Sequence, residues 1–248
     1  RNYNVDRSRV VLDFGKGSTL FGLRLATHFP DRFAGLIVRW PVDANGLRLG
    51  SLNGIPVLLI QSADTKDDCD KLKKKLDVAS PGSCTVIEAT GYPFKAATPE
   101  IEKWMASVKR DLNRKRVVLE PNDDRYKQGY WASIGAMDAL STLAQDQRPR
   151  FEVEADRKTN RIVVKARGIE GFALYLNDSL VDLDKEYVIE VNGKAFTEKR
   201  SRSRSTMLEL LVKKLDANYL YPASTQMLVP KSEASKGDAA PASGEPKR

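Results

Sequence analysis

Histidine and cysteine are scarce in this 248-residue chain, which contains one histidine, His28, and two cysteines, Cys69 and Cys84. A single histidine with no CxxC motif and no cluster of ligand residues excludes the common zinc sites, and we expect neither a metal nor a cofactor. The acidic run TKDDCDK at 65–71 fits the negative first turn of a helix better than a cation site. Two cysteines do not make a disulfide framework, and these lie near opposite ends of an expected helix–strand pair, so we expect free thiols.

Long apolar runs are also missing. No run approaches the roughly 20 residues that a membrane-spanning helix needs, so the sequence predicts no membrane span. The chain begins with Arg1 rather than methionine and shows no signal peptide, so we expect a fragment or a processed chain. Hydrophobic residues still make up 41% of the chain, which is enough for a substantial core.

Acidic residues are fewer than basic ones, which gives a formal net charge of +8. Much of the excess lies in DKLKKKL at 70–76 and KRDLNRKR at 109–116. No recognition motif accompanies these stretches, so nucleic acid is not the expected partner. A basic protein that binds polyanions through Lys71–Lys75 and Arg200–Arg204 is one alternative interpretation.

The first 115 residues alternate between two patterns. Short apolar runs typical of strands lie at 9–13, 35–40, 56–62 and 84–90. Helical spacing or helix-start signals lie at 18–28, 66–76 and 98–113. In the last of these, Thr98 is the expected capping residue and Pro99 follows at the first position. This alternation with short loops predicts an α/β fold of parallel strands with helices on both faces.

The pattern changes near Arg116. Half-apolar alternating runs follow, including a hairpin across 150–166 and an aromatic run at 126–134 that favours a single strand. We therefore expect a mainly antiparallel β-sandwich with one helix near 205–215.

The end of the chain has a different composition again. Residues 231–248 contain no large apolar residue, which predicts a disordered tail. The expected division of the chain is therefore 1–115, 116–230 and 231–248.

The most informative stretch is RVVLDFGKGSTLFGLRLATHFPDRFAG at 9–35, which indicates a strand, a glycine-lined turn and an amphipathic helix. This is the context of the nucleophile elbow G-x-S-x-G, in which a reactive serine stands on the turn. The residues from Asp13 to Gly17 occupy the five motif positions; the final glycine is kept, and Gly15 stands where the serine would be. Walker-type and dinucleotide-binding glycine motifs do not match.

The surroundings of this turn resemble α/β-hydrolases of the esterase and prolyl-oligopeptidase-like type. The stretches that carry the resemblance are YNVDRSRVVL, HFPDRFAGLIV, LNGIPVLLIQSADTKDD and CTVIEATGYPF. They span about residues 3–112 and correspond to the C-terminal half of such a domain. Residues 116–229 resemble the β-rich domain that follows some bacterial esterase-like hydrolases, which implies a bacterial envelope or secreted protein.

The resemblance also implies where a catalytic triad would stand. The nucleophile position holds Gly15, the acid position Asp64 and the histidine position Tyr92. The backbone N–H of Lys16 corresponds to the family's oxyanion donor. Gly15 supplies no oxygen, and a phenol, which ionises only near about pH 10, is a poor base at neutral pH. We therefore expect an inactive hydrolase homologue with a binding or scaffolding role.

Other residues leave alternatives. An active serine hydrolase, esterase or peptidase, would need a relocated nucleophile such as Ser18 or Ser62, although we expect Ser18 to cap the helix. His28 lies about ten residues, roughly 15 Å, from the turn, and we expect it to interact with the helix dipole rather than act as a base. The Gly15–Gly17 turn, with free N–H groups and Lys16, is a candidate site for a small anion, unless its glycines only permit a tight turn.

Overall fold

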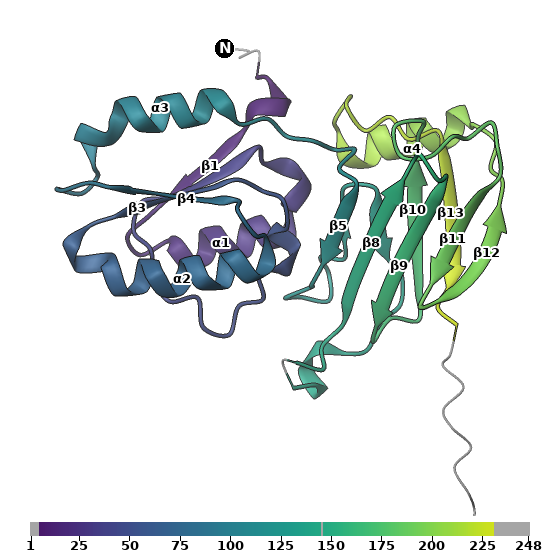
Figure 1. The fold of residues 1–248 in the computed structure, drawn as a ribbon, viewed down its shortest axis with the longest axis horizontal. Helices are drawn as coiled ribbons and strands as arrows, with labels where there is room; N and C mark the ends of the chain where they lie inside the picture. The colour runs from purple at the N-terminus through teal and green to yellow at the C-terminus, as the bar shows by residue number, and fades with distance from the viewer. Residues whose placement is uncertain (1–4, 145, 231–248) are drawn as a thin grey trace, which may run out of the picture.

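The computed structural model describes residues 5–144 and 146–230, which form an α/β unit followed by a β-rich unit (Figure 1). The predicted tail at 231–248 lies outside the described residues. Among the helices of the described part, none combines the length and the apolarity that a membrane crossing requires.

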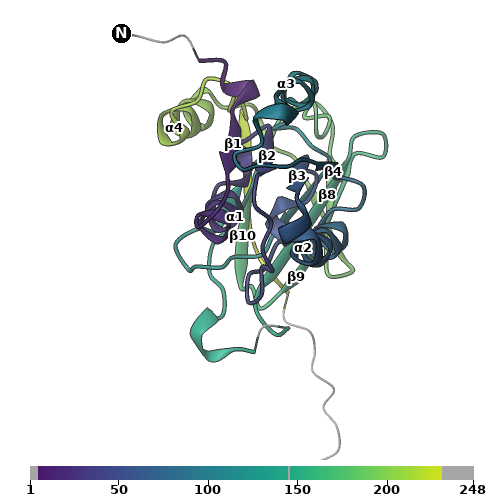
Figure 2. The ribbon, with the colours of Figure 1, turned by 90° about the vertical axis from the view of Figure 1, so that its left-hand side faces the viewer.

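Four parallel strands form the sheet of the α/β unit, in the order β1-β2-β3-β4. They are β1 (Val11–Phe14), β2 (Gly35–Val38), β3 (Val57–Gln61) and β4 (Cys84–Glu88). The helices of this unit are α1 (Thr19–His28), α2 (Lys66–Ala79) and α3 (Thr98–Ser107). Figure 2 shows α1 and α2 below the sheet and α3 above it, so the predicted α/β class with helices on both faces is confirmed.

The central strands β2 and β3 are buried along their whole length, which explains why their sequences, GLIV and VLLIQ, are almost continuously apolar. The neighbours Leu58 and Leu59 of β3 point to opposite faces, as successive strand residues do. Leu59 belongs to a core cluster with Leu23 of α1 and Leu72 of α2. Leu58 belongs to a second cluster with Ile101 of α3. Each face of the sheet therefore has its own core.

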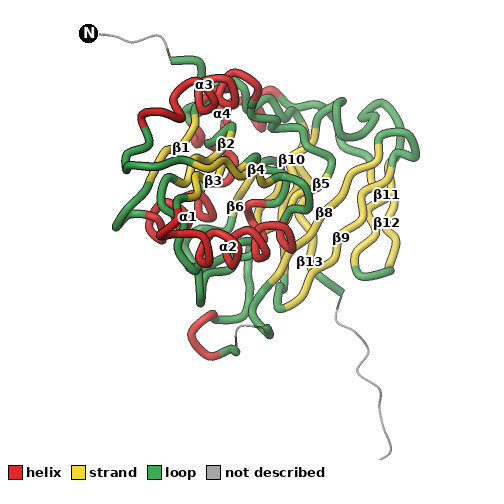
Figure 3. The backbone as a smooth tube through the Cα atoms, turned by 60° about the vertical axis from the view of Figure 1, so that its left-hand side comes forward, coloured by secondary structure: helices red, strands yellow, loops and turns green. Residues whose placement is uncertain are grey.

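Two sheets pack face to face in the β-rich unit, and Figure 3 shows strands of the larger one running side by side. The larger sheet, in the order β12-β11-β9-β8-β5, consists of β5 (Arg116–Leu119), β8 (Arg150–Asp156), β9 (Arg161–Arg167), β11 (Tyr187–Val191) and β12 (Lys194–Glu198). The smaller sheet, in the order β13-β10-β7-β6, consists of β6 (Gln128–Gly129), β7 (Ala132–Ile134), β10 (Gly171–Leu176) and β13 (Ala223–Leu228). Helix α4 (Arg204–Lys214) precedes β13.

Two pairings in this unit differ from the expectation. Strands β9 and β11 pair in parallel, with Ile162 opposite Ile189. The chain leaves β9, forms β10 in the other sheet and returns to β11 in the same direction, so the crossover produces a parallel pair. The run at 126–134 is a tight hairpin of β6 and β7 rather than one strand, because Tyr130 turns the chain with a φ of +54°.

Boundaries of the predicted elements shift by a few residues, and the largest shift is at α3. This helix ends at Ser107 rather than near Asn113, because the chain then enters the junction between the units, where Arg110 pairs with Asp216. Thr98 is the first helical residue rather than the cap, and its hydroxyl donates to a carbonyl of the preceding turn at 2.7 Å. Single 3-10 turns lie at Arg7–Arg9, Pro30–Arg32, Gly50–Leu52, Ala63–Thr65, Lys95–Ala97 and Leu140–Thr142.

Both cysteines are free thiols, as predicted: Cys69 is buried in α2 and Cys84 is half-buried at the start of β4. Burial raises the pKa of Cys69 to about 11 and that of Cys84 to about 12. Since the thiolate is the reactive form, neither side chain is a nucleophile near neutral pH.

Charged side chains are buried where the two units meet. The guanidinium of Arg110 forms an ion pair with Asp216 (Nη1–Oδ2, 2.8 Å), and both side chains are almost fully buried. Lys214, at the end of α4, pairs with Asp31 at 2.8 Å, and the hydroxyl of Tyr219 also donates to Asp31. We call these five residues the junction cluster; they connect segments that lie far apart in the sequence.

Candidate functional site

The turn between β1 and α1 keeps a strand–turn–helix arrangement. Gly15 follows β1 and is buried, and its carbonyl accepts hydrogen bonds from the N–H (2.9 Å) and the hydroxyl (2.5 Å) of Ser18. Gly17 has a φ of +86°, a conformation that favours glycine. Helix α1 then begins at Thr19, whose hydroxyl donates to the carbonyl of Trp40 at 2.6 Å. The turn is therefore tight and fixed to the end of β2.

Tyr92 lies beside the space into which a side chain at position 15 would project. A Cβ atom on Gly15 would lie 3.4 Å from both Cε2 and the hydroxyl of Tyr92, and 2.9 Å from Cβ of Arg39. The last distance is shorter than two such carbon atoms adopt, so a side chain at this position would force Arg39 to move. The structure thus brings Gly15 and Tyr92 together, and a side chain at position 15 would fit only after Arg39 shifts.

Aromatic rings surround the phenol of Tyr92. Trp40 and Phe94 both meet it edge to face, with ring centroids 5.8 Å and 5.6 Å away. The ammonium of Lys16 lies 4.9 Å from the ring centroid of Trp40 and 6.0 Å from that of Tyr92. Tyr92 itself remains 45% exposed, so this cluster is partly open to solvent. Cation–π contacts of this kind orient Lys16 over the aromatic surface.

Arg39, which follows β2, connects β1 and the loop after β4 by hydrogen bonds. Its Nε and Nη2 both donate to the carboxylate of Asp13 at 2.8 Å, and its Nη1 donates to the carbonyl of Pro93 at 2.8 Å. Hydrogen bonding to Asp13 raises the pKa of Arg39, so the guanidinium stays charged. We call the following residues the β1 corner: Asp13, Gly15, Lys16, Arg39, Trp40 and Tyr92.

Sequence reasoning placed Asp13 in the turn motif but did not assign Arg39 or Trp40 to this corner. A usable signal existed, because Asp13 lies near the carboxyl end of β1 and the other two residues directly follow β2. The carboxyl ends of neighbouring parallel strands meet at one edge of a sheet, which is where α/β proteins place their ligands.

Asp64, the expected acid, does not join Gly15 and Tyr92. It lies exposed in the 3-10 turn after β3 and makes no hydrogen bond or ion pair with other described residues. Ser62, one of the alternative nucleophiles, forms a capping box with Thr65, their hydroxyl oxygens 3.2 Å apart. The three triad-equivalent positions are therefore not connected as a relay.

Ser18, the other alternative nucleophile, was expected to cap α1, and this expectation is wrong. It occupies the N-cap position, but its side chain makes no capping hydrogen bond. The tight turn instead places its hydroxyl against the carbonyl of Gly15, to which it donates at 2.5 Å. A hydroxyl held in this way has no adjacent base to remove its proton.

His28 lies in the last turn of α1, at the opposite end of the helix from Gly15. Its ring stacks on Tyr126 with centroids 4.2 Å apart, and its Nε2 is buried without a hydrogen-bond partner among the described residues. Burial lowers the pKa of His28, so the ring is held neutral. The expected interaction with the helix dipole requires a positive charge, so aromatic packing at the junction replaces it.

A groove of about 650 Å³ lies at the carboxyl ends of β3 and β4. Its polar lining residues are Gln61, Ser62, Lys66, Glu88, Thr90 and Glu100. Gln61 is largely buried, and its side-chain amide donates a hydrogen bond to Glu88 at 3.2 Å. Two of the polar groups of the groove are therefore bonded to each other. The groove adjoins the turn that carries Asp64 and has no lining residue from the β1 corner.

The basic stretches that suggested polyanion binding are largely paired. Lys73 lies 2.5 Å from Asp77 one turn along α2, and Lys75 forms an ion pair with Asp43. Arg202 bridges two carboxylates at 2.7 Å and 2.5 Å. These partners neutralise part of the local charge, and polyanion binding at the two stretches stays a prediction.

The carboxylates that Arg202 bridges belong to a small acidic group. Asp178, Asp182 and Asp184 have oxygen atoms within 4.8 Å of one another. Arg202 pairs with the first and the third, and Lys185 lies 3.2 Å from Asp182. Side-chain cations of the chain itself thus balance this group.

Comparisons with protein-family models, with curated proteins and with solved structures found no match to this chain.

Proposed function

We propose that this chain is an α/β-hydrolase-like protein that has lost hydrolytic activity and serves in binding or scaffolding. The observation that carries the proposal is the packing of Tyr92 beside Gly15, at the turn where the resembled family holds its nucleophile. The order of the four parallel strands and the position of this turn after β1 are consistent with the resemblance.

Acyl transfer needs an activated nucleophile and a base within hydrogen-bond reach of it. Gly15 has no side chain, and the hydroxyl of Ser18 is occupied by the carbonyl of Gly15. Tyr92 stands where the base would be, and the single histidine is neutral and stacked on Tyr126 at the far end of α1. These four residues therefore do not supply both roles at this turn.

Binding at the β1 corner remains chemically reasonable. The backbone N–H groups of Lys16 and Gly17 make no hydrogen bond within the described residues, and the turn precedes the N-terminus of α1. With the Lys16 ammonium nearby, these groups favour a small anion over a neutral ligand. The role of the corner is then to hold a ligand rather than to cleave it.

Turnover of p-nitrophenyl acetate and butyrate by the purified chain tests the proposal. We expect hydrolysis at the rate of the same buffer with heat-denatured protein. Enzymatic turnover that disappears in Asp64→Ala or Ser18→Ala would contradict the proposal. Arg161→Gln, a substitution of an exposed arginine on β9, serves as the control that should change nothing.

A further inference from the structure

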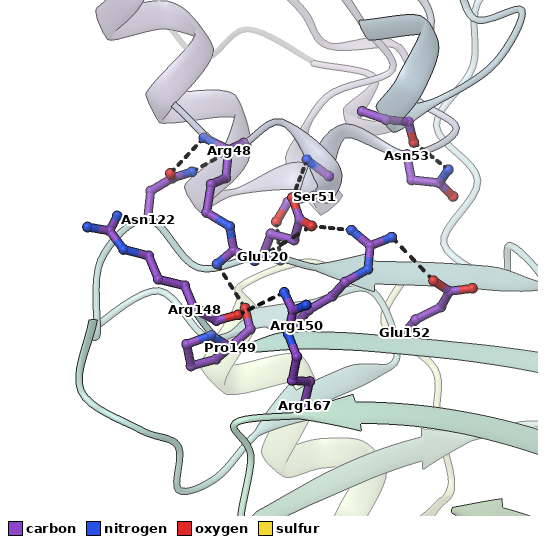
Figure 4. A network of polar contacts seen from close by, with 12 residues as sticks. Arg48, Ser51, Asn53, Glu120, Asn122, Arg148, Pro149, Arg150, Glu152 and Arg167 are labelled. Carbon is purple, nitrogen blue, oxygen red and sulfur yellow. Dashed lines mark hydrogen bonds and ion pairs between the residues drawn. The ribbon is translucent and has the colours of Figure 1, made fainter. Parts of the chain in front are cut away.

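Three arginines converge where the loop after β2 meets strands β8 and β9 (Figure 4). Arg48 is buried at 7% exposure, and its Nη1 donates to the carbonyl of Pro149 at 2.8 Å. Arg150 lies at the start of β8, and Arg167 at the end of β9 donates to the carbonyl of Arg148 at 3.2 Å. Guanidinium groups from three distant segments therefore share one region.

The carboxylates of this region are already engaged. Glu120 pairs with Arg150, lies 3.6 Å from Arg48, and accepts a further hydrogen bond from the N–H of Gly50 at 2.9 Å. Glu152 pairs with Arg150 at 3.3 Å and also with a neighbouring arginine of β5. Arg167 has no carboxylate partner within the part of the chain that the structure describes. Positive charge is thus left in excess.

Strand register places like charges opposite each other at this point. Arg150 and Arg167 are direct partners in the antiparallel pair of β8 and β9. Like charges in this arrangement are destabilising, and here Glu120 and Glu152 offset the charge of Arg150 while no carboxylate pairs with Arg167 among the described residues. Burial, together with the guanidinium groups of Arg167 and Arg150, lowers the pKa of Arg48, which is consistent with crowding of positive charge. An anion bound there would relieve this repulsion.

A groove of about 230 Å³ lies against Arg150 and Arg167, and Arg48 is not among its lining residues. Its lining residues are Arg150, Glu152, Lys165, Ala166, Arg167 and Asn192. Lys165 and Arg167 are exposed, so their charged groups can meet a ligand. The amide of Asn192 is committed to the backbone of Ala166, with both hydrogen bonds at 2.9 Å. The groove is thus small, and its lining has three basic side chains and one acidic one.

We propose that this groove, the arginine groove, binds a compact anion that carries at least two negative charges. Arg167 presents a planar guanidinium fork, which matches the paired oxygens of a phosphate or carboxylate group, and Lys165 adds a point charge. The terminal nitrogens of Arg150, by contrast, are held by Glu120 and Glu152. The site is separate from the β1 corner and does not depend on the function proposed for it. Phosphate esters and polycarboxylates share this chemistry, and the test below separates them.

Calorimetric titration of the full chain with pyrophosphate, citrate, inorganic phosphate and acetate at low salt tests the proposal. We expect saturable binding of pyrophosphate that weakens with added salt, and no saturation with acetate. Pyrophosphate well above citrate would assign a phosphate ester, and the reverse order a polycarboxylate. In Arg167→Gln, the affinity should fall by about tenfold or more, because a charge-assisted contact is lost.

The matched control is Arg161→Gln, which removes an exposed arginine from the other end of β9, where Glu190 is its partner. Its affinity for pyrophosphate should stay within about twofold of the unsubstituted chain. Arg167→Gln should melt, without added anion, at or above the temperature of the unsubstituted chain, because it removes the charge opposite Arg150. Absence of saturable binding by any of the multivalent anions, or equal losses in both variants, would overturn the proposal.

Discussion

The junction cluster and the β1 corner both use charged side chains to connect distant segments, but they differ in exposure. At the junction, Arg110 and Asp216 are 2% and 1% exposed, whereas in the corner Arg39 and Asp13 are 23% and 38% exposed. A buried pair cannot lose one partner without leaving a charge in a poorly solvated place, while water can replace either partner of a half-exposed pair. The fold therefore depends on the junction, and the corner is the more adaptable region.

The largest effect is expected from Asp216→Asn. This substitution keeps the shape of the side chain but leaves the guanidinium of Arg110 buried without its counter-charge. The free energy of unfolding should fall by about 3–5 kcal/mol in urea titrations followed by circular dichroism. Asp184→Asn is the control: its carboxylate is exposed, and loss of its pair with Arg202 should leave the urea midpoint almost unchanged. Equal losses in the two variants would remove the distinction between the regions.

Gly15→Ala should have the next largest effect. The added Cβ would meet Cβ of Arg39 at 2.9 Å and must displace it, so overpacking should lower the free energy of unfolding by about 1–3 kcal/mol. The same urea titration measures it. A variant as stable as the original would show that the corner is looser than the structure indicates.

Lys16→Ala should have a smaller effect. The exposed ammonium contributes cation–π contacts to Trp40 and Tyr92, which are worth about 0.5–1 kcal/mol at a surface site. Fluorescence of Trp40 should also change, since its ring loses the neighbouring charge. If Lys16→Ala lowered the free energy of unfolding by more than Gly15→Ala, the expected ranking of the two variants would be wrong.

The smallest effect is the pH dependence that His28 adds to the junction. Its pKa in the folded chain is lowered, chiefly by burial, with Arg24 and Arg125 opposing protonation and Asp123 favouring it. Because the unfolded chain, with a histidine pKa of about 6.5, then binds the proton more tightly, stability should fall as the pH drops below that value.

Titration of the His28 ring signals by NMR should give a pKa below 6.5. His28→Gln should lose less stability than the original chain between neutral pH and mildly acidic pH. A midpoint above the ordinary histidine value would contradict the expected burial of the ring against Tyr126.

The sequence predicted correctly those elements whose burial pattern can be recognised from their own residues. The apolar run of β3 is buried on both faces, and its sequence alone indicates a central parallel strand. The parallel pairing of β9 with β11 was missed, because strand direction depends on the intervening crossover and not on either strand's residues.

The candidate sites show the same division. Gly15 and Tyr92 could be selected from the sequence through the strand–turn–helix pattern and the family resemblance. Arg39 could not, because its contact with them depends on strand order. Charge runs in the sequence pointed to α2, where local carboxylates pair with the lysines. The basic side chains of the arginine groove come from β8 and β9 and form no run in the sequence.

Covalent labelling with a fluorophosphonate probe, followed by intact-mass and peptide mass spectrometry, tests the central claim most directly. The probe reacts with an activated serine whatever the natural substrate, so it does not depend on guessing an ester. The account predicts no adduct on the folded chain, because Gly15 has no side-chain oxygen and the hydroxyl of Ser18 donates a hydrogen bond to the carbonyl of Gly15. A single adduct at Ser18 or Ser62 that is lost on unfolding would contradict it.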